Sequence, residues 1–343
     1  MADCSALAHD ALRTAWFPWQ RARRIMREQE RVHIATRRKT IAAGACHSLA
    51  LRRDGSGVAC WGAEERGDSD DSDDSDPYDV GQAPLEGIDG DFIAIAAGER
   101  HSLALRRNGS VACWGDNDVG QAPPDGVDGD FVAIAAGGAH SLALRRNGSV
   151  ACWGAERGDD DDSDDSDDDD IDVGQAPPDG VEGEFIAIAA GGIHSLAIRH
   201  DGNIACWGWN RYGQAPPDGV EGDFIAIAAG GYHSLALRRN GSVACWGRNG
   251  YGQAPPDGVE GDFVAIAAGG HHSLAIRRDG NIACWGNNRS GQAPPDGVEG
   301  DFIAIAAGGA HSLALRRDGR IACWGENYHA QAPPEGVAGP FDV

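Results

Sequence analysis

The chain repeats one unit of 39 residues seven times, and this repetition constrains the fold more than any other feature. Each copy carries the string HSLA, and successive copies are separated by 54, 39, 54, 39, 39 and 39 residues. A unit this short cannot bury its own apolar face, so neighbouring units must stack on one another. Length alone allows two domains, but the repeat predicts one continuous array. The histidines of the seven strings are His47, His101, His140, His194, His233, His272 and His311.

Each unit has the pattern of a small antiparallel sheet. In the third copy an apolar run (130–137) precedes an alternating segment (140–146), and an Asn-Gly pair then leads into a returning strand (149–154). Asn-Gly and Asp-Gly pairs are strong hairpin signals, because both central residues of the tight turn need positive φ. We expect the following GQAPP string (174–178) to add a short outer edge strand, because proline is confined to sheet edges.

Seven such units predict an all-β protein, a seven-bladed β-propeller of four-stranded antiparallel blades over residues 40–343. A helical solenoid would need an apolar period of 3.6 residues, which these units lack. The last unit ends just after the start of a strand whose remainder stands at the beginning of the first unit. We therefore expect Phe341-Asp342-Val343 to lie beside Thr40 to Gly44 and to close the ring.

The tryptophan, histidine and cysteine that recur in every unit are predicted to be structural. The tryptophans are expected as wedges in the core, and the histidines as buried groups bonded to backbone rather than to a metal. The cysteines lack a CxxC pair, and equivalent positions in adjacent blades lie too far apart for a disulfide. Buried free thiols indicate an intracellular protein, cytoplasmic or nuclear. No segment is apolar enough to span a membrane.

No catalytic motif is visible in the sequence. It contains no nucleophile elbow, no phosphate loop and no obvious general acid–base pair. We therefore expect a protein that is not an enzyme and needs no metal or cofactor.

Charge is distributed very unevenly along the chain. The formal net charge is −24, and two runs (68–79 and 159–172) contribute 18 aspartates. They fall in insertions at 63–79 and 155–172, which we expect to be disordered and solvated. Residues 1–39 instead carry nine Arg and Lys against four acidic residues and are predicted to form a basic, helical extension. The overall acidity makes nucleic acid an unlikely partner.

The repeated pattern G-G-x-H-S-L-A-L, a turn, V-A-C-W-G and N-x-x-G-Q resembles the repeat of the regulator of chromosome condensation family. The resemblance covers residues 40–343 and implies a seven-bladed propeller. It also implies an alternative function, guanine-nucleotide exchange on a small GTPase. Two features depart from the family. QAPP replaces the usual Gly-Gln-Leu-Gly, and no unit has the long wedge-like insertion with which the namesake engages its GTPase. A less favoured alternative is an enzyme inhibitor, since the fold also resembles a propeller-type β-lactamase inhibitor.

The near-identical units differ most strongly from one another at two places. One is the residue before each HSLA histidine, and the other is the loop after each WG pair. Antiparallel strands put both places at the same end of every blade, so one face of the disc varies while the other stays constant. Loops on a rigid scaffold commonly carry binding, and Trp, Tyr and Arg commonly anchor interfaces.

We therefore predict a protein–protein interaction propeller that binds through this variable face. The partner is unidentified, with a small GTPase and a basic protein as the classes considered. Trp209 and Tyr232 are the expected anchors, with Tyr251, Arg211 and Arg248 around them. The full predicted set is Ile193, Trp209, Arg211, Tyr212, Tyr232, Arg248, Tyr251, His271, Arg289, Tyr328 and His329.

Overall fold

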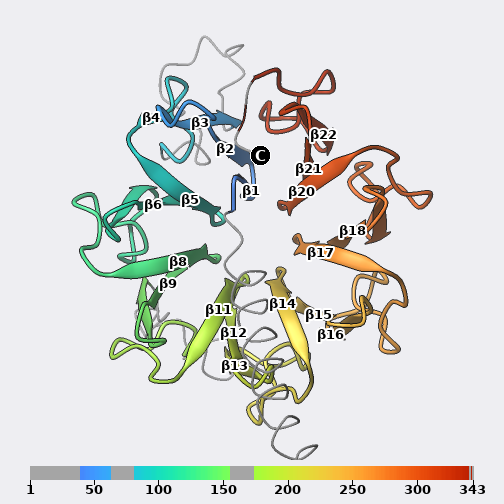
Figure 1. Cartoon of the computed structure of the whole chain (residues 1–343), viewed down its shortest axis with the longest axis horizontal. Helices are drawn as coiled ribbons and strands as arrows, with labels where there is room; N and C mark the ends of the chain where they lie inside the picture. Colours follow the sequence, from blue (N-terminus) through green and yellow to red (C-terminus); the bar gives the residue numbers. More distant parts are fainter. Residues whose placement is uncertain (1–38, 63–80, 155–173, 340, 342–343) are drawn as a thin grey trace, which may run out of the picture.

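A computed structural model describes residues 39–62, 81–154, 174–339 and 341. These residues form seven antiparallel sheets arranged as blades around a central axis (Figure 1). Blade one contains β1 (Ile41–Ala43), β2 (His47–Leu51), β3 (Gly57–Gly62) and β4 (Ile88–Asp89). Blades two and three contain β5 (Phe92–Ala97), β6 (His101–Arg106), β7 (Val111–Gly115), β8 (Phe131–Ala136), β9 (His140–Arg145) and β10 (Val150–Gly154).

Blades four to seven repeat the same arrangement, with the first strand of each blade nearest the axis (Figure 1). Their strands are β11 (Phe185–Ala190), β12 (His194–Arg199), β13 (Ile204–Gly208), β14 (Phe224–Ala229), β15 (His233–Arg238), β16 (Val243–Gly247), β17 (Phe263–Ala268), β18 (His272–Arg277), β19 (Ile282–Gly286), β20 (Phe302–Ala307), β21 (His311–Arg316) and β22 (Ile321–Gly325). The all-β class and the seven-bladed ring are thus confirmed. The predicted helix within residues 1–39 and the acidic insertions at 63–79 and 155–172 lie outside the described residues, Lys39 excepted.

The outer strand of each blade is shorter than expected and lies elsewhere in the sequence. In blade three, Val181 pairs with Val150 of β10 through two backbone hydrogen bonds of 2.9 Å, and blades two and four to seven each have one such bridge. The prediction that the GQAPP string forms the edge strand is therefore wrong. The chain turns at its prolines, where Gly180 donates to the carbonyl of Pro177 at 2.8 Å with a φ of 74°. Pairing begins only after that turn.

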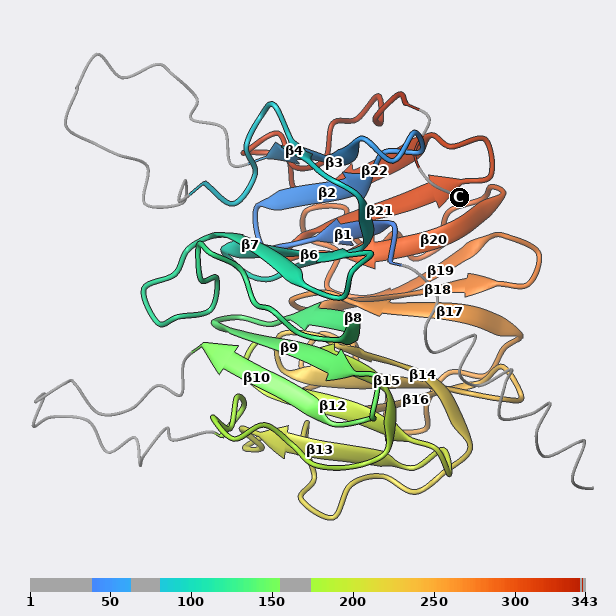
Figure 2. The same cartoon turned by 60° about the vertical axis from the view of Figure 1, so that its left-hand side comes forward.

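The core consists of apolar layers between adjacent blades rather than one central cluster. Between blades two and three, Leu103 and Val111 are fully buried and pack with Phe131, Ile134 and Ala143 of the next blade. Figure 2 shows the blades as successive tilted layers. Because both faces of a blade are covered, the small alanines on one side leave room for the larger side chains on the other.

A repeated polar clamp joins each blade to the next. Between blades three and four, the Nε2 of His140 lies 2.9 Å from the Oγ of Ser195. The Oγ of Ser195 and the Nε1 of Trp207 both donate to the carbonyl oxygen of Gln175, each at 3.0 Å. Since the serine hydroxyl donates to a carbonyl, the imidazole must donate from Nε2 to the serine oxygen.

The same clamp occurs at all seven interfaces, including the one from blade seven to blade one. The histidines were expected to bond to backbone, and this was wrong: their partner is a serine side chain of the neighbouring blade. The tryptophans were expected as core wedges. They are partly buried beside the apolar clusters, and their indole N–H groups complete the clamps.

The first glycine of the G-G-x-H turn is required by this ring of histidines. A Cβ placed on Gly137 would overlap the ring of His140 and lie 2.5 Å from the carbonyl oxygen of Gly191 in the next blade. Only glycine allows the backbone of one blade to approach the buried imidazole and the neighbouring turn this closely.

The two ends of the chain complete blade one together. Phe341 forms a bridge with Arg52, and the amide of Leu51 donates to the carbonyl of Thr40 at 2.9 Å. Phe341 is buried in the same cluster as Ile41 and Leu313. Closure by Phe341 is confirmed: Phe341 and Thr40 lie against the adjacent residues Arg52 and Leu51, so the two segments together supply one inner strand. Asp342 and Val343 lie outside the described residues.

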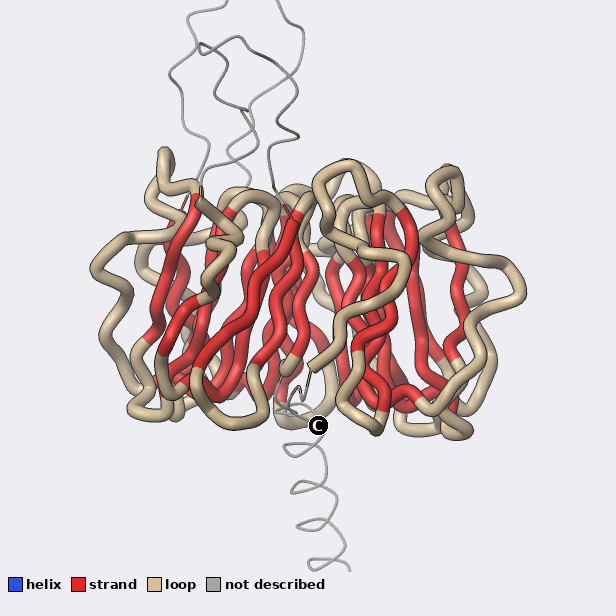
Figure 3. The backbone as a smooth tube through the Cα atoms, turned by 90° about the horizontal axis from the view of Figure 1, so that it is seen from above, coloured by secondary structure: helices blue, strands red, loops and turns tan. Residues whose placement is uncertain are grey.

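Strand direction gives the disc two faces (Figure 3). We call upper the face that carries the loops before each second strand and after each third strand. The register confirms that these loops share one end, because His194 pairs with Gly208 in blade four and the equivalent pair recurs in every blade. The lower face carries the Asn-Gly and Asp-Gly turns. Only the glycine of each pair has positive φ, 91° at Gly148, so the expectation of positive φ at both residues was wrong.

Candidate interaction surface

The upper-face loops are held rigidly by the Asn and Gln of the N-x-x-G-Q motif. In blade four, the Oδ1 of Asn210 accepts from the amide of Ala215 at 2.8 Å, and the Oε1 of Gln214 accepts from the amide of Tyr212 at 3.0 Å. The amide of Trp209 donates to the carbonyl of Ile193 at 2.9 Å, which ties the two variable loops of the blade together. The motif therefore fixes the backbone and leaves the intervening side chains free to vary.

Aromatic side chains from blades four and five meet across the blade boundary. Trp209 lies edge-to-face with Tyr212 at 5.3 Å between ring centroids, and 5.8 Å from Tyr232 of the next blade. Tyr212 and Tyr232 are 6.1 Å apart at an interplanar angle of 87°. All three pairs have the separations at which aromatic rings attract one another.

The ring contacts continue into blade six. Tyr232 stacks on His271 at 6.1 Å with an interplanar angle of 14°, and Tyr251 lies 5.4 Å from the same imidazole. His271 is half-buried, and desolvation together with the nearby charge of Arg248 lowers its pKa. The imidazole is therefore neutral at pH 7 and acts as a fourth flat ring between the tyrosines.

Two arginines lie over these rings. The guanidinium carbon of Arg248 is 5.2 Å from the ring centre of Tyr212 and 5.6 Å from that of Tyr232. Arg289 lies 5.4 Å from the ring centre of Tyr251. All three distances fall within the range of cation–π attraction, which holds each guanidinium over the aromatic rings.

Seven of the eleven predicted residues therefore form one continuous group, the aromatic–arginine cluster: Trp209, Tyr212, Tyr232, Arg248, Tyr251, His271 and Arg289. Ile193 and Arg211 flank it in blade four. Tyr328 and His329 belong to blade seven, outside this group. Tyr328 is 68% exposed.

Charge divides the upper face into two sectors. The upper loops of blades four to six (191–193, 209–213, 230–232, 248–252, 269–271 and 287–291) contain three arginines and no Asp or Glu. Blade two instead presents Glu99, Asp116 and Asp118 beside Arg100, and blade seven presents Glu326. The two acidic insertions follow Gly62 of blade one and Gly154 of blade three, both at this upper end. The cluster is thus a positive, aromatic sector on a strongly acidic protein.

The lower face repeats one arrangement instead of varying. In blade five Arg238 lies over the ring of Phe224 at 5.5 Å, and the Nε of Arg239 lies 3.1 Å from a carboxylate oxygen of Asp223. Similar arginine–phenylalanine stacks occur in blades two to seven. Repetition in nearly every blade indicates a structural role. The sequence pattern alone does not predict this stacking of arginine on phenylalanine.

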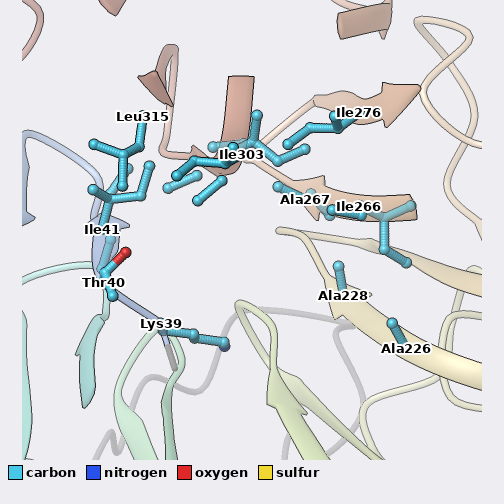
Figure 4. A pocket seen from close by; sticks show the side chains of 18 of the residues that line it. Lys39, Thr40, Ile41, Ala226, Ala228, Ile266, Ala267, Ile276, Ile303 and Leu315 are labelled. Atoms are coloured by element: carbon cyan, nitrogen blue, oxygen red, sulfur yellow. The ribbon is translucent and has the colours of Figure 1, made fainter. Parts of the chain in front are cut away.

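A central cavity of about 1160 Å³ runs between the inner strands. Much of its wall is alanine and isoleucine, among them Ala226, Ala228, Ile266 and Ile303, with Lys39 near blade one (Figure 4). The strongly repeated wall offers little to distinguish one ligand from another, so we place the candidate site on the upper face.

The described residues contain no group of three or more His, Cys, Asp or Glu side chains that could hold a metal ion. The described cysteines are free thiols, and burial raises the pKa of those in the ACWG strings to about 12. Thiols with so high a pKa are poor nucleophiles at neutral pH. Within the part of the chain that the structure describes, we find no helix of the length and apolarity needed to cross a membrane.

Comparisons with known proteins agree with this architecture. The sequence model of the RCC1-like domain matches residues 26–292, and that of the regulator of chromosome condensation (RCC1) repeat matches residues 302–331. A search of curated protein sequences gives no match.

Similar solved structures include the CRINKLY WD40 ectodomain of the Arabidopsis thaliana receptor kinase ACR4, at 22% identity and a TM-score of 0.62, covering 86% of this chain and 98% of that one. The ectodomain of the Physcomitrella patens receptor kinase CR4 has 22% identity and a TM-score of 0.63, covering 84% and 73%. Prp20p from Saccharomyces cerevisiae, described with its binding to Gsp1p and histones, has 20% identity and a TM-score of 0.58, covering 88% and 84%. At these identities the structural likeness shows the fold alone. The match of the family model to most of the sequence shows that the chain belongs to the RCC1-like domain family.

Proposed function

We propose that this protein is a non-enzymatic interaction module that binds a protein partner through the aromatic–arginine cluster on its upper face. The observation that carries the proposal is the continuity of the cluster across three blades. The variable positions of blades four, five and six join in one patch, although each blade contributes them independently. Chance variation in separate exposed loops has no reason to assemble tyrosine, tryptophan and arginine into a single group.

The composition and rigidity of the cluster suit a binding hot spot. Trp, Tyr and Arg are the residues most enriched at the energetic centre of interfaces. The loop backbones are already fixed by Asn and Gln side chains, as Asn249 and Gln253 show in blade five. Little loop-ordering entropy would therefore be lost on association. We further propose an intracellular protein, cytoplasmic or nuclear, because the described cysteines are free.

Affinity purification with the full chain would identify the partner, and matched variants would locate its site. We expect Trp209→Ala or Tyr232→Ala to weaken binding by about 30-fold or more, corresponding to at least about 2 kcal/mol. Arg238→Ala on the lower face is the control and should change affinity by less than about fivefold. An equal loss in the control would show that binding does not depend on the upper face.

Guanine-nucleotide exchange on a small GTPase is the second candidate, because a similar structure, Prp20p, is described with binding to Gsp1p. The activity would consist of accelerating the dissociation of nucleotide from the GTPase, without covalent chemistry. Nucleotide release measured over a panel of small GTPases would test it. If the protein stimulates nucleotide release and Trp209→Ala abolishes the stimulation, exchange is the function of the cluster. If it stimulates release from none of the GTPases, the cluster serves binding without exchange.

A further inference from the structure

We propose that the aromatic–arginine cluster binds a carboxylate-rich segment of its protein partner, with Arg248 and Arg289 receiving the carboxylates. This inference rests on the proposed function and names the chemistry of the partner. The starting observation is that aromatic rings fix the position of the two guanidiniums, while no carboxylate among the described residues balances their charge. Within the described chain, neither side chain makes a hydrogen bond or an ion pair, and their contacts are with aromatic rings.

A guanidinium carries its N–H groups in one plane, as a fork of donors. This is the arrangement that pairs with a carboxylate through two parallel hydrogen bonds. Arg248 lies over both Tyr212 and Tyr232, so two rings from adjacent blades restrict its position. The side chain is therefore ordered before a ligand arrives, which reduces the entropy lost on binding.

The charge around the cluster points to an anionic ligand. The upper loops of blades four to six contain no carboxylate that could satisfy the arginines, although the whole chain has a net charge of −24. On the lower face, the second arginine of the Arg-Arg pair lies against an acid in several blades, for example Arg278 with Asp262 at 2.8 Å. The absence of such partners from these particular loops leaves the charge of Arg248 and Arg289 available to another molecule.

The size of the positive sector favours a short acidic peptide segment over a nucleic acid. The sector covers three blades, and the same face carries acids in blade two and receives the aspartate-rich insertions beside Gly62 and Gly154. A long polyphosphate chain would extend into that acidic sector and be repelled. A few carboxylates on a folded or extended protein segment can remain within the three blades and still reach both guanidiniums.

Fluorescence anisotropy with the full chain tests the inference directly. The probe is a labelled peptide of six glutamates and one tyrosine, compared with an equivalent lysine peptide and with a short single-stranded RNA. We expect the glutamate peptide to bind, to bind more weakly as salt is raised, and to lose about tenfold in affinity with Arg248→Gln or Arg289→Gln. Arg248→Lys keeps the charge but loses the planar fork, and should recover only part of the affinity.

Arg238→Gln is the matched control, because Arg238 also lies over an aromatic ring but on the lower face. It should leave peptide binding unchanged, and circular dichroism melts would confirm that each variant is folded. The inference is overturned if the glutamate peptide does not bind, if Arg238→Gln weakens it equally, or if RNA binds more tightly at the same residues. If sedimentation shows a dimer and Arg248→Gln converts it to a monomer, the cluster instead binds a second copy of the chain. If Trp209→Ala abolishes partner binding while both arginine variants retain it, the proposed function stands and this inference fails.

Discussion

Acidification from pH 7.5 to 5.5 should strongly destabilise the propeller, because its interfaces contain seven buried imidazoles that must stay neutral. Each donates from Nε2 to a serine of the next blade, and the Nδ1 of each has no hydrogen-bond partner among the described residues. Protonation at Nδ1 would place an uncompensated charge in the core. Burial lowers the pKa from 6.5 to about 3 for five of them and to about 4 for the other two: His47, His140, His194, His233 and His311, then His101 and His272.

The direction of the effect follows from these values. Between pH 6.5 and about 4 the unfolded chain binds protons that the folded chain cannot, so stability is complete above pH 6.5 and falls as the pH drops. At pH 5.5 each histidine lowers the free energy of unfolding by about 1.4 kcal/mol, and the seven together lower it by about 10 kcal/mol. That loss is comparable with the whole free energy of unfolding of an ordinary domain, about 5–15 kcal/mol.

Urea unfolding followed by tryptophan fluorescence, repeated at intervals from pH 7.5 to 5.5, measures this loss. Carboxylates titrate mainly below this window, so the slope reports the histidines. We expect the slope to approach seven protons taken up on unfolding, and His233→Gln to lower it by about one. A free energy of unfolding that changes by less than about 2 kcal/mol over the window would refute the reasoning.

Three further perturbations test the architecture. Phe341→Ala should cost about 3 kcal/mol, since it removes the buried ring that begins the closing strand, and an unchanged melting temperature would contradict closure. Gly137→Ala should lower the melting temperature sharply because its Cβ would overlap a buried histidine, whereas Gly250→Ala, with open space around it, should not. Replacing 68–79 and 159–170 with short Gly-Ser links should leave the circular dichroism spectrum intact. It should also raise stability slightly at low salt, where self-repulsion is least screened. A calcium-dependent shift in melting temperature that the parent chain shows and the replaced chain lacks would instead indicate structural calcium sites.

Most residues of the candidate cluster on the upper face could be predicted from the sequence. Comparing near-identical units separates constant from variable positions, and antiparallel pairing then assigns Tyr232 and Trp209 to one face. That reasoning could not tell which variable residues touch. His271 joins the cluster because it lies between tyrosines of blades five and six, whereas Tyr328 of blade seven remains separate. Contact between blades depends on side-chain rotamers and on blade spacing, neither of which a repeat period specifies.

The sequence by itself determined the number of blades, the Asn-Gly and Asp-Gly hairpins, the two distinct faces and the residues that close the ring. These features depend on local turn chemistry and on the fixed period of 39 residues, which act within one unit. Only the tertiary structure decided what joins the units. Blade packing decides the bond from His140 to Ser195 and the shared carbonyl of Gln175. The direction of the turn decides the outer pairing of Val181. Such contacts join residues 20 to 55 positions apart, where the geometry of the assembled ring selects the partner.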